Sequence, residues 1–283
     1  MSGVSVLTLN KGRRPHLDNL LAGLARGAPP DECVVVEMGG DESPLPALPF
    51  PVRRVMLPAE GLALAGARNA ARRAATGETL IFLDVDCIPS RTLVTGLAEA
   101  ARARDGLICC EILYLPAGAA EGAWTEAGLE ALGQTHPVRS FPAEGLAEID
   151  NAGLFWSLAF AVRAASFDRI GGFDEDFSGY GGEDTDLAFR AAAAGLPLLF
   201  AGGMRAFHQH HASCDPPLQH FSDIVRNSRR FHARHGFWPM SGWLDAFAGL
   251  GLIAPDRARD LTVLRAPTPE EIAAARLAPE RVF

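Results

Sequence analysis

Short apolar runs alternate with stretches of helical periodicity over the first 115 residues, and this alternation most narrows the possible folds. The apolar runs lie at residues 4–9, 33–36, 52–57, 79–83 and 107–114, and the helical stretches at residues 16–26, 62–75 and 92–104. Strands that alternate with helices are typical of βαβ units, which place their strands in parallel. We therefore predict an α/β fold with a Rossmann-like, mostly parallel central sheet flanked by helices.

The second half of the chain has weaker periodicity. Residues 116–149 are rich in Gly, Ala and Pro and predict a long loop, which is longer than most loops in compact domains. The predicted elements that follow are a strand at 150–162, helices at 163–170 and 183–194, short strands at 198–201 and 204–208, and a long helix at 217–235. We expect one domain over residues 1–215, with halves 1–115 and 116–215, and a helical C-terminal extension over residues 216–283.

Polar residues end several of the predicted strands. Thr8 and Asn10 close the first strand, Glu37 closes the second, and Asp84 and Asp86 follow the fourth. Ligands of parallel sheets bind beyond the carboxyl ends of the strands. These five residues are therefore the first candidates for a binding site.

Asp84, Val85 and Asp86 form an Asp-x-Asp sequence at the end of a buried strand. Residues two apart in a strand point to the same face, and buried carboxylates are costly unless a cation meets them. Oxygen ligands suit Mg²⁺ or Mn²⁺. The pattern therefore favours a divalent cation, although one Asp could instead cap the next helix while the other is solvated.

A second acidic group, Glu183 and Asp184, follows Gly181 and Gly182 and opens a helix. The helix dipole favours ionised carboxylates in a first turn, so such a group is available as a general base at neutral pH. The glycines, with Tyr180 before them, allow a substrate to approach the backbone closely. The plainer interpretation is a helix start with favourable charges.

Three histidines lie within four residues, at His208, His210 and His211. Histidine is a common metal ligand, and one His added to two Asp would suit Mn²⁺. A zinc site made by the histidines alone would lack the usual Cys or Glu spacing. We favour His208 as the ligand, with His210 and His211 as possible substitutes.

Composition limits the function classes. The net charge is −8, with no long basic run, which argues against a nucleic-acid partner. Five cysteines without a CxxC pair indicate reduced thiols and a cytoplasmic location. The sequence begins without a secretory signal pattern and has no stretch of transmembrane length, so any membrane contact would be peripheral.

Seven short segments together resemble one known family. They are VSVLTLN (4–10), VVVE (34–37), GARN (66–69), LDVD (83–86), GGFDED (171–176), GGEDTD (181–186) and AFHQ (206–209). Their order resembles the inverting family 2 glycosyltransferases with the GT-A fold, and the second half resembles the galactosyltransferase-type C-terminal segment. The resemblance covers residues 4–211 and implies a nucleotide-sugar-binding half (1–115) and an acceptor-binding, catalytic half (116–215).

The resemblance also implies roles for individual residues. Donor binding would fall to Thr8, Asn10, Glu37, Arg68, Asn69, Asp84, Val85 and Asp86; metal binding to Asp86, His208 and Asp84; acceptor binding to Trp156, Tyr180, Gly181 and Gly182. Asp184 would be the base, and Glu183 would hold the acceptor or the donor sugar. The implied donor is a UDP-sugar, although Glu37-Met38-Gly39-Gly40 departs from the usual pattern. The implied acceptor is a saccharide or glycoconjugate.

Other functions share some of these features. A sugar nucleotidyltransferase would also combine an α/β sheet with metal-binding carboxylates, and Lys11 to Arg14 partly match the basic loop that it needs. A non-catalytic nucleotide-sugar-binding module would keep the fold without the base. A metal-binding interaction protein would use the histidines alone. The presence of both acidic groups favours the transferase.

Overall fold

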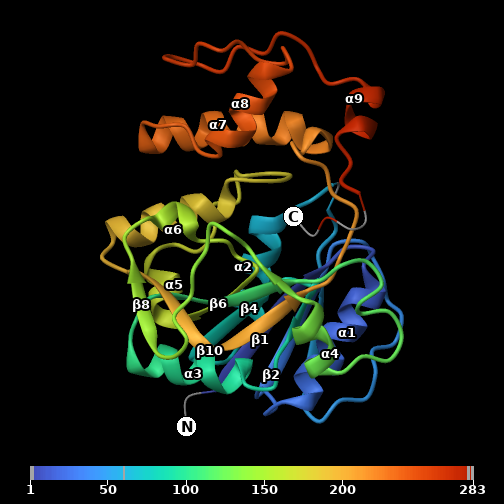
Figure 1. Cartoon of the computed structure of the whole chain (residues 1–283). Coiled ribbons are helices and arrows are strands. Elements are labelled where there is room, and N and C mark those ends of the chain that lie inside the picture. The colour runs from blue at the N-terminus through green and yellow to red at the C-terminus, as the bar shows by residue number, and fades with distance from the viewer. Residues whose placement is uncertain (1–2, 60, 279–280, 282–283) are drawn as a thin grey trace.

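The computed structural model describes residues 3–59, 61–278 and 281 of the chain and has a mixed ten-stranded sheet at its centre (Figure 1). The main path of the sheet runs β3-β2-β1-β4-β9-β6-β10-β5, with β7 beside β6 and β8 beside β10. The bounds are β1 (Val4–Asn10), β2 (Glu32–Glu37), β3 (Val52–Met56), β4 (Thr79–Leu83), β5 (Cys87–Pro89), β6 (Leu107–Tyr114), β7 (Gln134–Thr135), β8 (Leu146–Ile149), β9 (Ala159–Arg163) and β10 (Leu198–His208).

Parallel pairing joins β3, β2, β1 and β4, and it also joins β6 to β10. Strand β9 is antiparallel to both β4 and β6, and β5, β7 and β8 pair antiparallel with their neighbours. The predicted α/β fold with a mostly parallel sheet is therefore confirmed, with antiparallel pairs added by the second half of the chain.

The sheet has a hydrophobic core on each face, because successive side chains of a strand point to opposite sides. In β2, Val34 and Val36 pack in one core and Cys33 and Val35 in the other. The helices α2 (Leu64–Ala74), α5 (Ala164–Arg169) and α6 (Glu183–Ala193) cover the first core, and α1 (Arg14–Arg26) and α3 (Leu93–Ala103) cover the second. The continuous apolar runs of the sequence correspond to this burial on both faces.

The two short strands predicted at residues 198–201 and 204–208 are one strand, β10. Its register against β6 shifts between Ala201 and Arg205, so the intervening glycines form a bulge rather than a turn. The chain around Pro142 lies so close to Gly202 that a Cβ there would be 2.2 Å from the Pro142 carbonyl oxygen. A continuous β10 matters for the site because its last residue is His208.

Residues 116–149, predicted as one long loop, contain regular structure. The helix α4 (Glu126–Leu132) and the strands β7 and β8 lie within it. The prediction was wrong because these elements are short and gain their order from tertiary contacts: Leu129 packs beside Trp124, Leu113 and Phe207. Local periodicity does not report such contacts.

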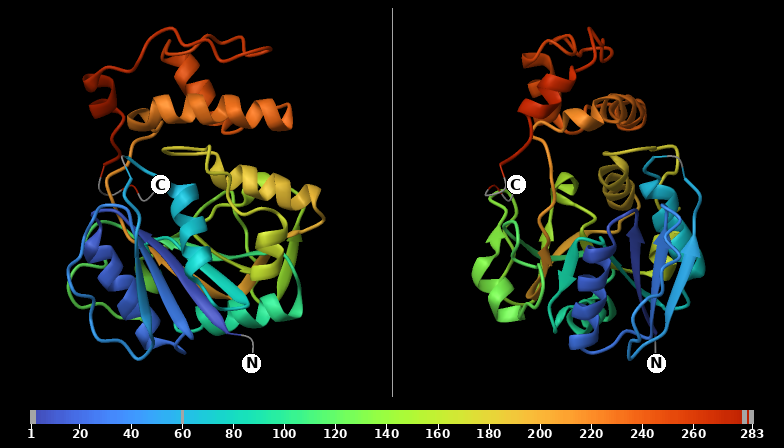
Figure 2. Two further views of the ribbon diagram at one scale, coloured as in Figure 1. Left: turned by 180° about the vertical axis from the view of Figure 1, so that it is seen from behind. Right: turned by 90° about the vertical axis from the view of Figure 1, so that its right-hand side faces the viewer.

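The C-terminal segment begins at residue 216, and its helices lie beyond α6 and the loop that precedes α6 (Figures 1 and 2). It contains the short 3₁₀ helix η2 (Leu218–His220) and the helices α7 (Phe221–His235), α8 (Ser241–Gly249) and α9 (Pro269–Ala274). Its buried side chains form a cluster of their own, including Phe221, Ile224, Leu244 and Phe247. None of the helices in the described part of the chain is long and apolar enough to cross a membrane.

Candidate active site

The turn between β4 and β5 holds Asp84 and Asp86 at the carboxyl edge of the sheet. The Asp84 amide donates to the Leu158 carbonyl at 2.8 Å, and the Cys87 amide donates to the Asp84 carbonyl at 2.8 Å. Strand β5 then pairs antiparallel with the end of β10, where His208 is opposite Cys87. The Gln209 amide donates to the Asp86 carbonyl at 2.6 Å. This pairing brings together two segments more than 120 residues apart in sequence.

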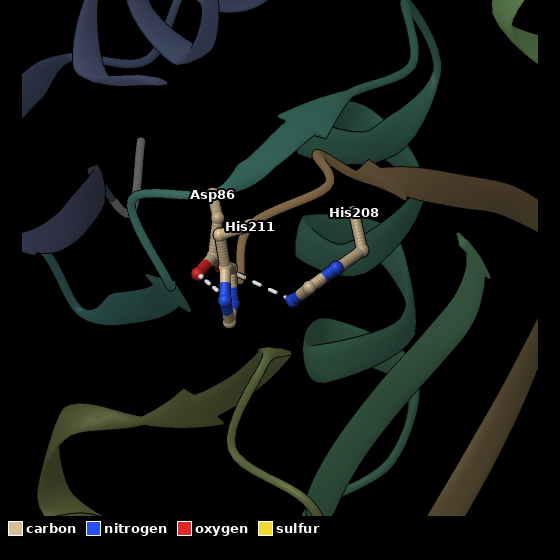
Figure 3. A group of neighbouring side chains, drawn as sticks. All are labelled: Asp86, His208 and His211. Carbon is tan, nitrogen blue, oxygen red and sulfur yellow. Dashed lines mark ion pairs between the residues drawn. The ribbon is translucent and has the colours of Figure 1, made fainter. Parts of the chain in front are cut away.

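Asp86, His208 and His211 form a group whose ligand atoms all lie within 4.8 Å of one another (Figure 3). His208 Nε2 is 3.7 Å from Asp86 Oδ1, and His211 Nε2 is 3.4 Å from Asp86 Oδ2. One carboxylate and two imidazoles are a donor set that can bind a divalent metal ion. Asp84 and His210 are not in this group, and the predicted metal role of Asp84 stays a prediction.

Arg13 also reaches this group, although the sequence pointed to it only as part of the basic stretch from Lys11 to Arg14. Its Nη1 is 2.5 Å from Asp86 Oδ2. Arg13 precedes α1 directly after β1, so it belongs to the same sheet edge as the other candidates. The position of Arg13 just after β1 could have marked it as a candidate, because the carboxyl edge of the sheet was predicted as the binding site. A guanidinium therefore occupies the neighbourhood in which a divalent cation would bind.

The protonation states of His208 and Asp86 are compatible with metal binding. Burial lowers the pKa of His208 to about 4, so its imidazole is neutral and can act as a ligand at neutral pH. Burial alone would raise the pKa of Asp86, but His208, His211 and Arg13 outweigh it and hold that pKa below its usual range. Asp86 is therefore ionised, as a ligand must be.

Arg68 links Asp84, in the turn between β4 and β5, to the second acidic group. It extends from α2, is 3% exposed, and donates to Asp84 Oδ1 and to Glu183 Oε1, each at 3.0 Å. Burial raises the pKa of Asp84 to about 6, and burial with the neighbouring Asp184 raises the pKa of Glu183 to about 7. One buried cation therefore pairs with two carboxylates that lie far apart in the sequence.

Asp184 is half-buried in the first turn of α6, and its Oδ1 accepts from the Thr185 amide at 2.6 Å. Gly182, in the left-handed region with φ +91°, is the N-cap residue of this helix. Burial, then the charges of Glu183 and Asp184, raises the pKa of Tyr180, and the Tyr180 ring stacks on His220. Tyr180, Glu183 and Asp184 all lie at or just before the first turn of α6.

The predicted nucleotide residues lie at the ends of β1 and β2. Asn10 is opposite Glu37, and its Nδ2 donates to both Glu37 oxygens at 3.0 and 2.9 Å. Burial raises the pKa of Glu37, although the Asn10 amide opposes this shift. Thr8 is fully buried, and its hydroxyl has no hydrogen-bond partner among the described residues.

Asn69 and Trp156 have surroundings that the sequence did not indicate. The Asn69 amide donates to the Phe173 carbonyl at 2.8 Å and accepts from the Phe173 amide at 3.0 Å, which fastens the start of the glycine-rich loop to α2. Trp156 packs edge-on against His136, with the Arg139 guanidinium 4.9 Å from its ring. Their predicted roles in donor and acceptor binding stay predictions.

Two families have sequence models that match this chain. The model described as "Glycosyl transferase family 2" matches residues 4–171. The model described as "N-terminal domain of galactosyltransferase" matches residues 150–212. The two matches overlap and together include the edge of the sheet, the glycine-rich loop and the histidines.

Curated relatives match a shorter part. Two proteins named validoxylamine A glucosyltransferase, from Streptomyces hygroscopicus subsp. jinggangensis (strain 5008) and subsp. limoneus, are each 40% identical over 86 residues, which is 29% of this chain. The matched part spans 19% and 17% of those relatives, respectively. Their activity as whole proteins therefore does not transfer directly.

Solved structures share the fold. S. aureus TarS 1-349 aligns with a TM-score of 0.56 and 14% identity over 81% of this chain and 65% of that chain. GalNAc-T7 with UDP, GalNAc and Mn²⁺ aligns with a TM-score of 0.56 and 19% identity over 75% of this chain and 44% of that chain. TarS 1-349 with UDP-GlcNAc aligns with a TM-score of 0.54 and 14% identity over 87% and 75%.

Proposed function

The chain belongs to glycosyl transferase family 2, and on that premise we propose that it moves a sugar from a UDP-sugar to an acceptor hydroxyl with inversion. The acceptor in this proposal is a saccharide or glycoconjugate. The UDP preference is supported by related folds whose structures contain UDP, UDP-GlcNAc or UDP with Mn²⁺. The family match favours sugar transfer over nucleotidyl transfer.

One observation carries the proposal: Arg68 joins Asp84 of the Asp-x-Asp turn to Glu183 beside Asp184. A donor diphosphate and an acceptor hydroxyl must meet for transfer, so donor-binding and base groups have to be neighbours. In this chain one buried guanidinium joins the Asp-x-Asp turn to the first turn of α6, which carries the candidate base.

The fit of the donor set to a divalent cation rests on Asp86, His208 and His211. These residues would hold Mn²⁺ or Mg²⁺, which supplies positive charge for the leaving nucleoside diphosphate. Arg13, now paired with Asp86, is close enough to offer its guanidinium to a donor phosphate instead.

Asp184 would take the proton of the acceptor hydroxyl at its carboxylate as that oxygen attacks the anomeric carbon. The bond to the diphosphate breaks on the opposite side, which inverts the configuration. Because the diphosphate leaves with its own charge, no general acid is required, whereas glycosidases use two carboxyl groups. Arg68 keeps Glu183 and Asp84 in place during this step.

The first experiment measures donor binding by thermal shift with UDP-, GDP- and dTDP-sugars in the presence of Mn²⁺, followed by donor hydrolysis with any sugar that binds. We expect a UDP-sugar to raise the melting temperature and EDTA to remove that increase. Binding that is unchanged in EDTA would contradict the metal role of Asp86 and the histidines.

The second experiment compares Asp184→Asn with Asp215→Asn, an exposed carboxylate outside the acidic groups. Asp184→Asn should bind the donor normally but lose transfer by at least about a hundredfold, the usual range for a positioned general base. Asp215→Asn should retain both properties. Substantial transfer by Asp184→Asn would exclude this residue as the base.

A further inference from the structure

The helix α7 lies along the loop of residues 177–182, which leads into α6 and Asp184 (Figure 2). Both family matches end by residue 212, so they do not include this helix. Helix α7 carries four arginines, Arg226, Arg229, Arg230 and Arg234. In the structure they pair within the protein, with Asp174, Asp176, Asp186, Asp223 and Asp260.

Asn227 is the centre of this contact. It is 1% exposed, and its Nδ2 is within hydrogen-bond distance of the carbonyl oxygens of Ser178 (3.0 Å), Tyr180 (3.3 Å) and Gly181 (2.8 Å). Buried carbonyl groups need donors, and a buried amide needs acceptors. The two N–H groups of one side chain of α7 are therefore shared among three carbonyl groups of the loop that precedes Asp184.

The loop is shaped to let α7 come this close. Gly179, Gly181 and Gly182 all have positive φ angles, of +77°, +90° and +91°. A Cβ at Gly179 would be 2.1 Å from Asp223 Oδ2, which accepts from the Tyr180 amide at 3.3 Å. Glycine is required at this position both for its backbone conformation and for the contact with α7.

A second attachment lies just beyond the base. Asp186 is completely buried and accepts from Arg234 Nη1 at 2.7 Å, while His235 Nε2 is 2.9 Å from the same oxygen. Arg230 and Arg234 also bind Asp174, which lies three residues before the loop. The chain on both sides of Asp184 is therefore hydrogen-bonded to α7. The loop before it contacts Asn227 and Asp223, and Asp186 after it contacts Arg234 and His235.

We propose that α7 fixes the position of Asp184 and Tyr180, with Asn227 as the principal positioning residue. This inference rests on the proposed function, because it concerns the group that deprotonates the acceptor. Misplacement of a catalytic group by about 1 Å can cost about a hundredfold in rate. The residue would therefore affect the transfer step, while donor binding depends on the ends of β1, β2 and β4.

The test compares Asn227→Asp with Arg229→Gln in the full chain. Asn227→Asp keeps the shape but replaces the donor with an oxygen that faces three carbonyl groups. Arg229 is on the same helix, but it binds Asp260 and the Leu261 carbonyl within the C-terminal segment. The measurements are kcat, donor KM, and the donor affinity and stoichiometry from calorimetry with a UDP-sugar and Mn²⁺.

We expect Asn227→Asp to lower kcat by about tenfold or more, with donor KM, affinity and stoichiometry within about twofold of the wild type. Full stoichiometry would show that the loss is not an unfolded fraction. Arg229→Gln should behave as the wild type. If Asn227→Asp does not fold, Arg234→Gln tests the second attachment in the same way.

The proposal is overturned if kcat of the folded variant stays within about twofold of the wild type, or if its donor affinity falls in parallel with kcat. The proposed function fails separately, through loss of donor binding in the wild type or retained transfer by Asp184→Asn. An inactive Asp184→Asn with a fully active Asn227→Asp would reject the positioning role alone.

Discussion

At the scale of single residues, Arg68 determines the charge balance of the site. Its guanidinium is buried between Asp84 and Glu183, and Asp184 is also close enough to raise its pKa. A buried cation with two carboxylate partners avoids the large cost of an unpaired buried charge. Glu183 nevertheless has a raised pKa, which makes the stability of the protein depend on pH.

We expect Glu183→Gln to flatten the pH dependence of stability between about pH 4.5 and 7. The pKa of Glu183 is raised by burial and by Asp184, from 4.5 to about 7, so the folded protein binds a proton that the unfolded chain releases. Its contribution to stability is complete below pH 4.5 and is lost as the pH rises through 7. Gln keeps an oxygen for Arg68 and has no proton to lose.

Urea unfolding at several pH values measures this difference. The exposed Glu121→Gln variant is the control and should retain the wild-type slope. An identical slope in the wild type and Glu183→Gln would mean that Glu183 is ionised throughout this range.

We expect Arg13 and a divalent cation to compete for Asp86. Because its guanidinium pairs with Asp86, a divalent cation must displace it, and Arg13→Gln should bind Mn²⁺ more tightly in the absence of donor. Arg13 is about one-third exposed, so the effect should be modest, about two- to fivefold. Electron paramagnetic resonance of free Mn²⁺ measures the affinity, and Arg14→Gln, whose partner is Asp18, is the control. Weaker Mn²⁺ binding by Arg13→Gln would contradict the competition.

Sequence reasoning selected Asp86, Arg68 and Glu183 but did not predict their contacts. The positions of strand ends follow from local patterns, so the carboxylates at the edge of the sheet were predictable. The pairing of Arg13 with Asp86 and of Arg68 with Glu183 joins residues 73 and 115 positions apart, and no local pattern encodes such contacts. His211 was considered only as a substitute, because its distance from Asp86 depends on the irregular chain after β10.

At the scale of elements, β10 shows where a local signal misleads. Two adjacent glycines are typical of turns, yet β6 offers backbone hydrogen bonds on both sides of them, and the strand continues through a bulge. Most helices and strands of the first half were predicted within a few residues, because their periodicity is strong. Elements that depend on packing, such as α4, were not.

Gly202→Ala should destabilise the protein by about 1–3 kcal/mol, the usual cost of overpacking. The added Cβ would meet the Pro142 carbonyl oxygen at 2.2 Å, and that atom is backbone and cannot rotate away. Gly242→Ala is the matched control: nothing lies within 4 Å of its Cβ, and Ala favours the helix α8. Denaturant midpoints measure both variants, and an unchanged midpoint for Gly202→Ala would show that the 142–145 segment moves freely.

At the scale of the whole molecule, the protein has two parts with separate hydrophobic clusters. The sheet and its helices form the larger part, and the C-terminal segment has its own buried cluster around Phe221 and Phe247. The polar face of α7 connects them through the glycine-rich loop. Sequence periodicity predicted a helix at 217–235 but not its contact with the glycine-rich loop. An amphipathic pattern shows that one face of a helix is buried, but it does not show which segment covers that face.

The chain between these parts passes through the candidate cation group. His208 ends β10, His211 follows three residues later, and η2 begins at Leu218. A bound ion would therefore hold the segment of residues 209–217 in place at His211, close to the exposed Ala212 and Asp215. We expect Mn²⁺ to slow elastase cleavage after Ala212 several-fold, because proteases cut chains that open locally. His211→Ala should abolish this protection; equal cleavage of the wild type with and without Mn²⁺ would show that the segment is not held. In this prediction the cation orders the segment between β10 and η2, in addition to neutralising negative charge.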